Sequence, residues 1–200
     1  PALRRFEVEV VAMAADMLHG KKDACGSVTS GGTESVLMAM KAYRDYARAT
    51  RGIERGEILC CETVHPAFEK AAHYFDMTTV HVKCDNDYRM DVAAAARAIT
   101  RNTVVIVGSA PQYSHGIVDP IPELSDLALK RGLPLHVDAC FGGYMLPWVE
   151  HLGYPVPEWD FRVPGVTSIS ADIHKYGYGP KGASTLVYRN ARYRKYQYFA

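Results

Sequence analysis

The sequence lacks a hydrophobic run long enough to cross a membrane, and neither sign of charge dominates it. A transmembrane helix needs about 20 predominantly apolar residues, and neither such a stretch nor a signal-like start is present. Lysines and arginines number 23 against 22 aspartates and glutamates, a net charge of +1. These interspersed charges exclude a broad basic surface for nucleic acid or anionic lipid. With 48% hydrophobic residues, the 200-residue chain has the composition of one globular domain.

Paired CxxC spacing is also missing. The five cysteines are Cys25, Cys60, Cys61, Cys84 and Cys140. An odd number without that spacing argues against a disulfide framework and a zinc site, and it favours a reducing compartment. Cys60 and Cys61 are neighbours in a strand-like stretch, where adjacent side chains face opposite ways, so we expect two small buried hydrophobic residues.

Helical and strand-like stretches alternate along most of the chain. Helical spacing of apolar residues predicts helices at 3–18, 33–50, 66–74, 92–100 and 121–131. Apolar runs predict strands at 57–61, 78–82, 103–108, 134–138, 165–170 and 183–188. Strands separated by helices imply an α/β fold, with a mostly parallel sheet and helices on both faces. Ligands bind such sheets beyond the carboxyl ends of the strands.

The segment VTSGGTES places Gly31, Gly32 and Thr33 at the start of a long predicted helix. Glycines let the backbone approach a ligand, and a helix start offers free N–H groups with a partial positive charge, so this segment predicts a phosphate cradle. The alternative is a simple helix cap, in which Thr33 and Glu34 satisfy the first turn. The segment is neither GxGxxG nor GxxxxGK[ST], so a dinucleotide site or a P-loop is unsupported.

The segment HVDAC places Asp138 at the carboxyl end of an apolar strand. A half-buried carboxylate favours a cationic partner, such as a protonated ring nitrogen. Alternatively, Asp138 caps the following turn through Gly142 and Gly143. His136 shares the strand face of Asp138, and we expect it to be a core histidine with satisfied hydrogen bonds.

Two further polar residues follow predicted strands. His65 precedes Pro66 at a helix start, where its ring either faces an aromatic ligand or caps the helix. Lys175 lies in SISADIHKYGYGPKGAS, followed by glycines, tyrosines and Lys181. A lysine in this setting predicts a Schiff base with an aldehyde cofactor. A phosphate cradle, a buried carboxylate, a stacking ring and a lysine are together what a pyridine aldehyde phosphate requires.

Several long segments resemble the sphingosine-1-phosphate lyases, pyridoxal-phosphate enzymes of the group II decarboxylase family. They are GSVTSGGTESVLMAMKAYRDYAR, HVDACFGGY, SISADIHKYGYGPKGAS, APQYSHGIVDPIPEL and WDFRVPGVTSIS. The resemblance implies the aspartate-aminotransferase-like fold type I of pyridoxal-phosphate enzymes. It also implies that residues 1–200 are the cofactor-binding large domain of a longer chain, with an N-terminal segment and a C-terminal small domain outside them.

The resemblance also implies roles for individual residues. Lys175 forms the Schiff base with pyridoxal 5'-phosphate, Asp138 pairs with the pyridine nitrogen, and His65 stacks on the ring. The residues that contact the phosphate are Gly31, Gly32 and Thr33, with Ser170 and His174 as additional contacts. Lys181 and Tyr113 match positions near the substrate, with Lys181 as the candidate for the general base or for positioning it and Tyr113 as the alternate. Alternatively, Lys181 makes a phosphate contact or a structural contact. No metal is expected.

The implied reaction is retro-aldol cleavage of a phosphorylated sphingoid base into a long-chain aldehyde and phosphoethanolamine. An amino-acid decarboxylase would use the same cradle, carboxylate and lysine, and only YGYGPKG after Lys175 favours the lyase. An inactive scaffold of the same fold is a third hypothesis, against which Lys175, Asp138 and His65 speak.

The expected partners are a small phospholipid-like substrate and a second copy of the chain, without nucleic acid. The resemblance implies a homodimer with a shared active site, and the aromatic residues of 193–199 are expected at its interface or in an interdomain connector. Residues upstream of this segment are expected to bind part of the substrate phosphate. The expected location is the cytoplasm, with a membrane anchor upstream left open.

Overall fold

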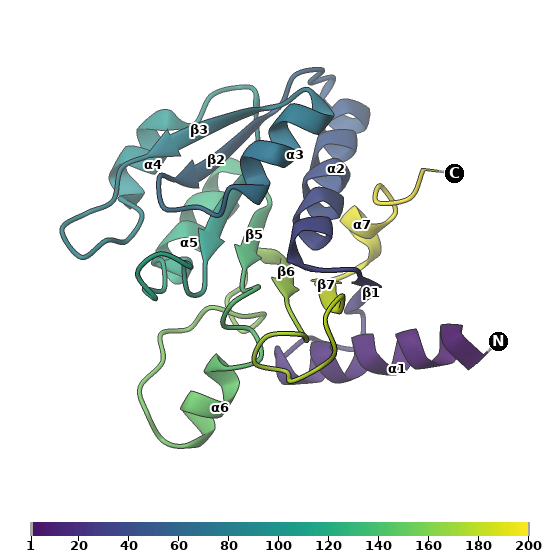
Figure 1. Cartoon of the computed structure of the whole chain (residues 1–200). Helices are drawn as coiled ribbons and strands as arrows, with labels where there is room; N and C mark the ends of the chain where they lie inside the picture. Colours follow the sequence, from purple (N-terminus) through teal and green to yellow (C-terminus); the bar gives the residue numbers. More distant parts are fainter. Residues whose placement is uncertain (1, 200) are drawn as a thin grey trace.

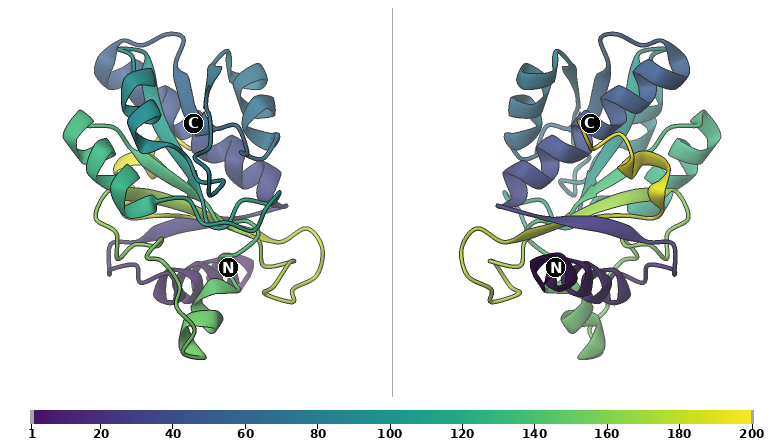
Figure 2. Two further views of the ribbon diagram at one scale, coloured as in Figure 1. Left: turned by 90° about the vertical axis from the view of Figure 1, so that its left-hand side faces the viewer. Right: turned by 90° about the vertical axis from the view of Figure 1, so that its right-hand side faces the viewer.

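The computed structural model describes residues 2–199, which form one sheet between two layers of helices (Figures 1 and 2). Its strands are β1 (Cys25–Thr29), β2 (Glu57–Cys61), β3 (Thr78–Val82), β4 (Thr103–Ser109), β5 (Leu135–Asp138), β6 (Val166–Ala171) and β7 (Ser184–Tyr188). They lie in the order β1-β7-β6-β5-β4-β2-β3. The α/β fold predicted from the sequence is therefore confirmed.

One strand runs against the others. The pairs β2–β3, β2–β4, β4–β5 and β5–β6 are parallel, whereas β7 pairs antiparallel with both β1 and β6. Because β6 and β7 are antiparallel neighbours, the segment between them leaves and re-enters the sheet at one edge. This is the edge at which the carboxyl ends of the parallel strands meet, and the segment carries Lys175.

Helices cover both faces of the sheet (Figure 2). The helices are α1 (Ala2–Met17), α2 (Gly32–Arg51), α3 (Ala67–Phe75), α4 (Val92–Ala98), α5 (Ile121–Arg131), α6 (Leu146–His151) and α7 (Ala191–Arg194). One apolar core lies under α2, α3 and α7, and the other lies under α1, α4 and α5. Within residues 2–199, none of these helices is both long enough and apolar enough to span a bilayer.

Neighbouring residues of β2 point into different cores. Ile58 and Cys60 pack with α2 and α3, whereas Leu59 and Cys61 pack on the opposite face. Both cysteines are buried, as predicted, and burial raises the pKa of the Cys60 thiol above its usual range. All five cysteines are free thiols.

Most predicted elements are present with small differences at their ends, but three were missed. These are β1, α6 and α7. The sequence of β1, CGSVT, is short, and only Val28 and Thr29 are strong strand formers, because the backbone at Gly26 lies close to β7. A Cβ atom at Gly26 would lie 2.3 Å from the carbonyl oxygen of Leu186. Because glycine has a low strand propensity, this strand could not be predicted from residue preferences alone.

The aromatic C-terminal segment packs on α2 of its own chain. The ring of Tyr193 lies 5.2 Å from that of Tyr43 and 4.8 Å from that of Tyr46, both edge-to-face. Lys41 Nζ donates hydrogen bonds to the carbonyl oxygens of Tyr196 (2.8 Å) and Tyr198 (2.7 Å). These contacts hold the C-terminal segment against α2, and the expected interface role stays a prediction.

His136 is a core histidine with satisfied hydrogen bonds, as predicted. Its Nδ1 lies 2.7 Å from Ser168 Oγ and its Nε2 lies 3.3 Å from Ser170 Oγ. The ring is fully buried, and burial lowers the pKa of His136 to about 3. The folded chain therefore keeps this ring neutral where an unfolded chain would protonate it.

Two leucines on α5 test the assignment of its buried face. Leu124 is fully buried and Leu129 is 57% exposed. We expect Leu124→Ala to lower the free energy of unfolding by about 2–5 kcal/mol, because it leaves a cavity. The matched Leu129→Ala should change it by less than about 0.5 kcal/mol. Chemical denaturation measures both, and equal losses would contradict the assignment.

Acid should destabilise the fold partly through His136. The His136 ring is protonated below about pH 6.5 in the unfolded chain, but only below about pH 3 in the folded chain. Between these pH values, the free energy of unfolding therefore falls by up to ~1.4 kcal/mol per pH unit as the pH decreases. His136→Gln should therefore lose less stability than the parent chain between about pH 7 and pH 5. The exposed His73→Gln serves as the control and should follow the parent. Denaturation at both pH values measures the difference, and parallel losses in all three proteins would refute the assignment.

Candidate active site

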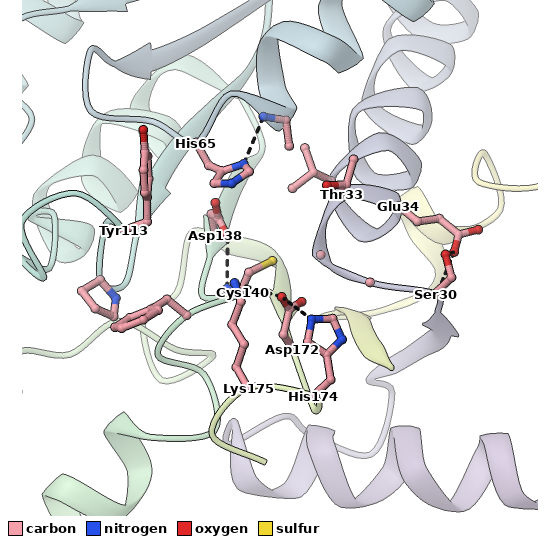
Figure 3. A pocket seen from close by; sticks show the side chains of 16 residues that line it. Ser30, Thr33, Glu34, His65, Tyr113, Asp138, Cys140, Asp172, His174 and Lys175 are labelled. Carbon is pink, nitrogen blue, oxygen red and sulfur yellow. Dashed lines mark hydrogen bonds and ion pairs between the residues drawn. The ribbon is translucent and has the colours of Figure 1, made fainter. Parts of the chain in front are cut away.

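A cavity of about 350 Å³ opens at the carboxyl edge of the sheet (Figure 3). This volume lies in the range of small-molecule sites. The start of α2 and the loops after β2, β4, β5 and β6 surround it. It is lined by Ser30, Gly31, Gly32, Thr33, Glu34, Val36, His65, Ala67, Pro111, Tyr113, Asp138, Cys140, Phe141, Asp172, His174 and Lys175.

The start of α2 lacks the side-chain cap by Thr33 and Glu34 that the sequence left open as an alternative. Glu34 Oε2 accepts hydrogen bonds from the N–H (2.6 Å) and the hydroxyl (2.7 Å) of Ser30, which lies before the cap residue Gly31, and the cap itself has no side-chain hydrogen bond. Gly31 adopts a φ of 152°, a conformation that disfavours other residues. Gly31, Gly32 and Thr33 meanwhile line the cavity. The first N–H groups of the helix have no acceptor within it and can bind an anion.

Asp138 ends β5 and is buried at the cavity floor. Its Oδ1 accepts hydrogen bonds from the N–H of Cys140 (3.0 Å) and the hydroxyl of Ser170 (3.4 Å). The carboxylate therefore caps the next turn at Cys140, not at the glycines expected from the sequence. Ser170 links Asp138 to His136 and lies outside the cavity lining.

His65 and Tyr113 form one wall of the cavity (Figure 3). The N–H of Ala67 donates to Nδ1 of His65 (3.1 Å), so this histidine caps the start of α3. Its ring lies 5.1 Å from that of Tyr113, with 72° between the planes. The cap and the cavity-facing ring predicted as alternatives are thus both present.

The loop between β6 and β7 holds Lys175 against a second buried acid, Asp172. Lys175 Nζ lies 3.0 Å from Asp172 Oδ2, and His174 Nε2 lies 3.5 Å from the same oxygen. The N–H of Ala183 donates to Nδ1 of His174 (3.2 Å), which fixes the orientation of that ring.

Glycines explain how this loop turns so tightly. Cβ atoms at Gly177 and Gly179 would each lie 2.7 Å from an atom of Ile173, its carbonyl oxygen and its Cγ2 respectively. The loop therefore wraps around Ile173 only with glycine at both positions. This wrapping leaves Lys175 at the cavity.

The structure brings most of the predicted residues together. The predicted residues that line the cavity are Gly31, Gly32, Thr33, His65, Tyr113, Asp138, His174 and Lys175. Ser170 lies beneath Asp138, and Lys181 lies in an exposed turn outside the lining. Asp172, Glu34 and Cys140 also line the cavity, although the sequence did not predict them as ligand contacts. Asp172 carries the same signal as Asp138, an acid that ends a run of small and apolar strand residues.

The thiolate form of Cys140 is disfavoured in this cavity. Burial and the neighbouring carboxylates raise the pKa of its thiol well above the usual value, so the thiol stays protonated. Its sulfur would lie 2.9 Å from a Cβ atom at position 32, so it fills space beneath the start of α2.

Known proteins are similar to this chain in both sequence and fold. The chain is 55% identical over 200 residues to sphingosine-1-phosphate lyase 1 of Rattus norvegicus, covering all of this chain and 35% of that protein. It is 53% identical over 201 residues to sphingosine-1-phosphate lyase of Arabidopsis thaliana, covering 98% of this chain and 37% of that protein. The chain thus spans about a third of the length of these curated relatives. The resemblance inferred from the sequence is confirmed.

Solved structures agree with these matches. A sphingosine-1-phosphate lyase of Burkholderia pseudomallei superposes with a TM-score of 0.97 at 50% identity, covering 100% of this chain and 48% of that one. A glutamate decarboxylase of Lactobacillus brevis superposes with a TM-score of 0.85 at 27% identity, covering 96% and 46%. The model of the pyridoxal-dependent decarboxylase conserved domain matches residues 1–195. The chain therefore belongs to the pyridoxal-dependent decarboxylase family.

Proposed function

We propose that this chain forms the cofactor-binding part of a pyridoxal-phosphate lyase that acts on phosphorylated sphingoid bases. The products would be a long-chain aldehyde and phosphoethanolamine. One observation carries the proposal: Lys175, Asp138 and the start of α2 face a single cavity. The 53–55% identity to proteins named sphingosine-1-phosphate lyases supports this substrate class.

The residues that line the cavity fit pyridoxal 5'-phosphate. Lys175 would supply the amine that bonds the aldehyde, and Asp138 would pair with the ring nitrogen. His65 and Tyr113 would border the ring, and the phosphate would occupy the start of α2 at Gly31, Gly32 and Thr33, with His174 as a further donor. Ser170 would act through Asp138, whose Oδ1 accepts its hydroxyl hydrogen.

When bound, this cofactor withdraws electrons from bonds at the amine-bearing carbon of the substrate. Asp138, buried and oriented by Cys140 and Ser170, would keep the ring nitrogen protonated, which maintains the withdrawal. Lys175 must lose a proton before it can act as a nucleophile. Asp172, 3.0 Å from Nζ, fixes the position of that amine at the cavity.

Cleavage of the carbon-carbon bond also needs a base for the substrate hydroxyl. We propose Tyr113 and Lys181 as the candidates. Tyr113 lines the cavity and packs its ring against His65. Lys181 lies in the exposed turn before β7 and would have to move toward a bound substrate. The present arrangement therefore favours Tyr113.

Amino-acid decarboxylation is the second candidate function. The family description and the TM-score of 0.85 to a glutamate decarboxylase favour it. It would use the same lysine, carboxylate and cradle, so the two reactions differ in the substrate bond that is cleaved.

We also infer a homodimer with a shared active site and a reducing, cytoplasmic location. The five free thiols support the reducing compartment. The exposed residues Leu3, Phe6 and Met13 on α1 support an additional protein contact. Sedimentation of the full-length protein tests the dimer, and a monomer at working concentrations would refute it.

Removing the amine should abolish the chemistry. We expect Lys175→Ala, in the full-length protein, to lose the visible absorption of lysine-bound cofactor and to lower turnover at least about a thousandfold. The exposed Lys130→Ala on α5 is the matched control and should keep both. Retention of the absorption band by Lys175→Ala would place the covalent bond elsewhere.

The products distinguish the two candidate functions. Full-length protein incubated with a phosphorylated sphingoid base should release a fatty aldehyde, measured by mass spectrometry. The same protein incubated with amino acids should release no carbon dioxide above the level of Lys175→Ala. The reverse pattern would establish a decarboxylase.

A further inference from the structure

The cavity has a surplus of acid where an anion must bind. Glu34, Asp138 and Asp172 line it, and Lys175 is the only lysine or arginine among its lining residues in the described chain. A phosphate monoester adds a charge of about −1.5 to −2 at neutral pH. If the proposed function holds, this anion enters a site that already contains a carboxylate.

The two histidines at the cavity do not offset this charge. Backbone N–H groups of Ala67 and Ala183 donate to Nδ1 of His65 (3.1 Å) and His174 (3.2 Å). Each Nδ1 is therefore an acceptor, and the ring proton lies on Nε2. A cationic ring would set an N–H against a backbone N–H. Both rings thus present an Nε2–H group at the cavity, and Nε2 of His174 lies 3.5 Å from Asp172 Oδ2.

Asp172 is the acid nearest to the cradle. It is 3% exposed, its Oδ2 faces Lys175 Nζ at 3.0 Å, and its Oδ1 has no hydrogen-bond partner within residues 2–199. A Cβ atom at Gly32 would lie 2.7 Å from Oδ1 and 2.8 Å from Oδ2, so the carboxylate rests against the start of α2. Figure 3 shows Asp172 between Lys175, His174 and this helix start.

The other titratable groups around Asp172 carry no positive charge. Burial raises the pKa of the Cys140 thiol, on the loop after β5, well above its usual value. Burial also raises the pKa of the Tyr144 phenol, which follows on the same loop. Both groups stay neutral, and Asp138 and Glu34 are acids. Lys175 is the one cationic side chain that faces Asp172 in this part of the chain.

We propose that Asp172 takes up a proton from solvent when a phosphate-bearing cofactor fills the cavity, and that its carboxyl group then donates a hydrogen bond to the phosphate. In the empty cavity Lys175 balances the carboxylate. With its amine bonded to the cofactor, Lys175 would no longer balance Asp172, and the carboxylate and the phosphate would repel each other at one helix start. A proton on Asp172 removes the repulsion and turns its free oxygen into a donor.

The inference rests on the proposed function and predicts coupled proton uptake. Full-length protein stripped of cofactor is titrated calorimetrically with pyridoxal 5'-phosphate in two buffers of different ionisation enthalpy. The parent should take up about one proton more than Asp172→Asn, which is neutral and nearly the same shape. The affinity of the parent should therefore fall, relative to Asp172→Asn, by about tenfold per pH unit toward alkaline pH.

Two controls isolate the phosphate and the hydrogen bond. With pyridoxal, which lacks the phosphate, the parent and Asp172→Asn should take up equal numbers of protons, and binding shows that both cavities are intact. Asp172→Ala should bind pyridoxal 5'-phosphate about ten- to a hundredfold more weakly than Asp172→Asn, because it has no donor.

Equal proton uptake by the parent and Asp172→Asn with pyridoxal 5'-phosphate would overturn the inference. Equal affinity of Asp172→Ala and Asp172→Asn would overturn the donor role. A parent protein that binds neither ligand would instead refute the proposed function.

Discussion

The antiparallel pairing of β6 and β7 is the constraint on which the site depends. Ala171 pairs with Thr185, so the intervening loop is tied to the sheet at both ends. A parallel strand at this position would need a long crossover and would take the chain to the other edge. The reversed strand instead returns the chain at once, which leaves Lys175 beside the carboxyl ends of β5 and β6. The cradle at the start of α2 lies next to it because β1 pairs with β7.

The hydrogen-bond donors around the cavity are mostly neutral groups with directions set by the backbone. Backbone N–H groups at the start of α2, the Nε2 donors of two histidines and hydroxyl groups converge on it, while its formal charge is negative. Fixed neutral donors of this kind need no reorganisation when an anion arrives. Their orientation is set by the backbone, since the two histidines are held by the amides of Ala67 and Ala183. Substitutions of these rings would therefore disturb the helix start and the loop as well as the ligand.

The alternating strands and helices could be predicted from the sequence, because their apolar residues recur at regular spacing. Sequence reasoning also placed the strand-end residues Asp138, His65 and Lys175 at one edge. It missed β1, whose small residues reflect a close backbone approach that only the partner strand reveals. Asp172 was missed although it lies at a strand end as Asp138 does and three residues before Lys175; only its approach to Gly32 depends on the fold. The spacing of residues in the sequence could not show that Ser170 is buried beneath Asp138 or that Lys181 lies in an exposed turn.

The position of β7 in the sheet has a consequence for biosynthesis. Thr29 pairs with Ser184, residues about 155 positions apart along the chain, and this pairing joins the cradle to the lysine loop. Contacts of such separation form late, because a long stretch of chain must be ordered before they are made. On the ribosome, the nascent chain up to β6 can assemble β2, β4 and β5 with their helices. The cradle at the start of α2 is completed only when β7 has emerged and paired with β1. Cofactor capture is thereby postponed until nearly the whole segment has been translated.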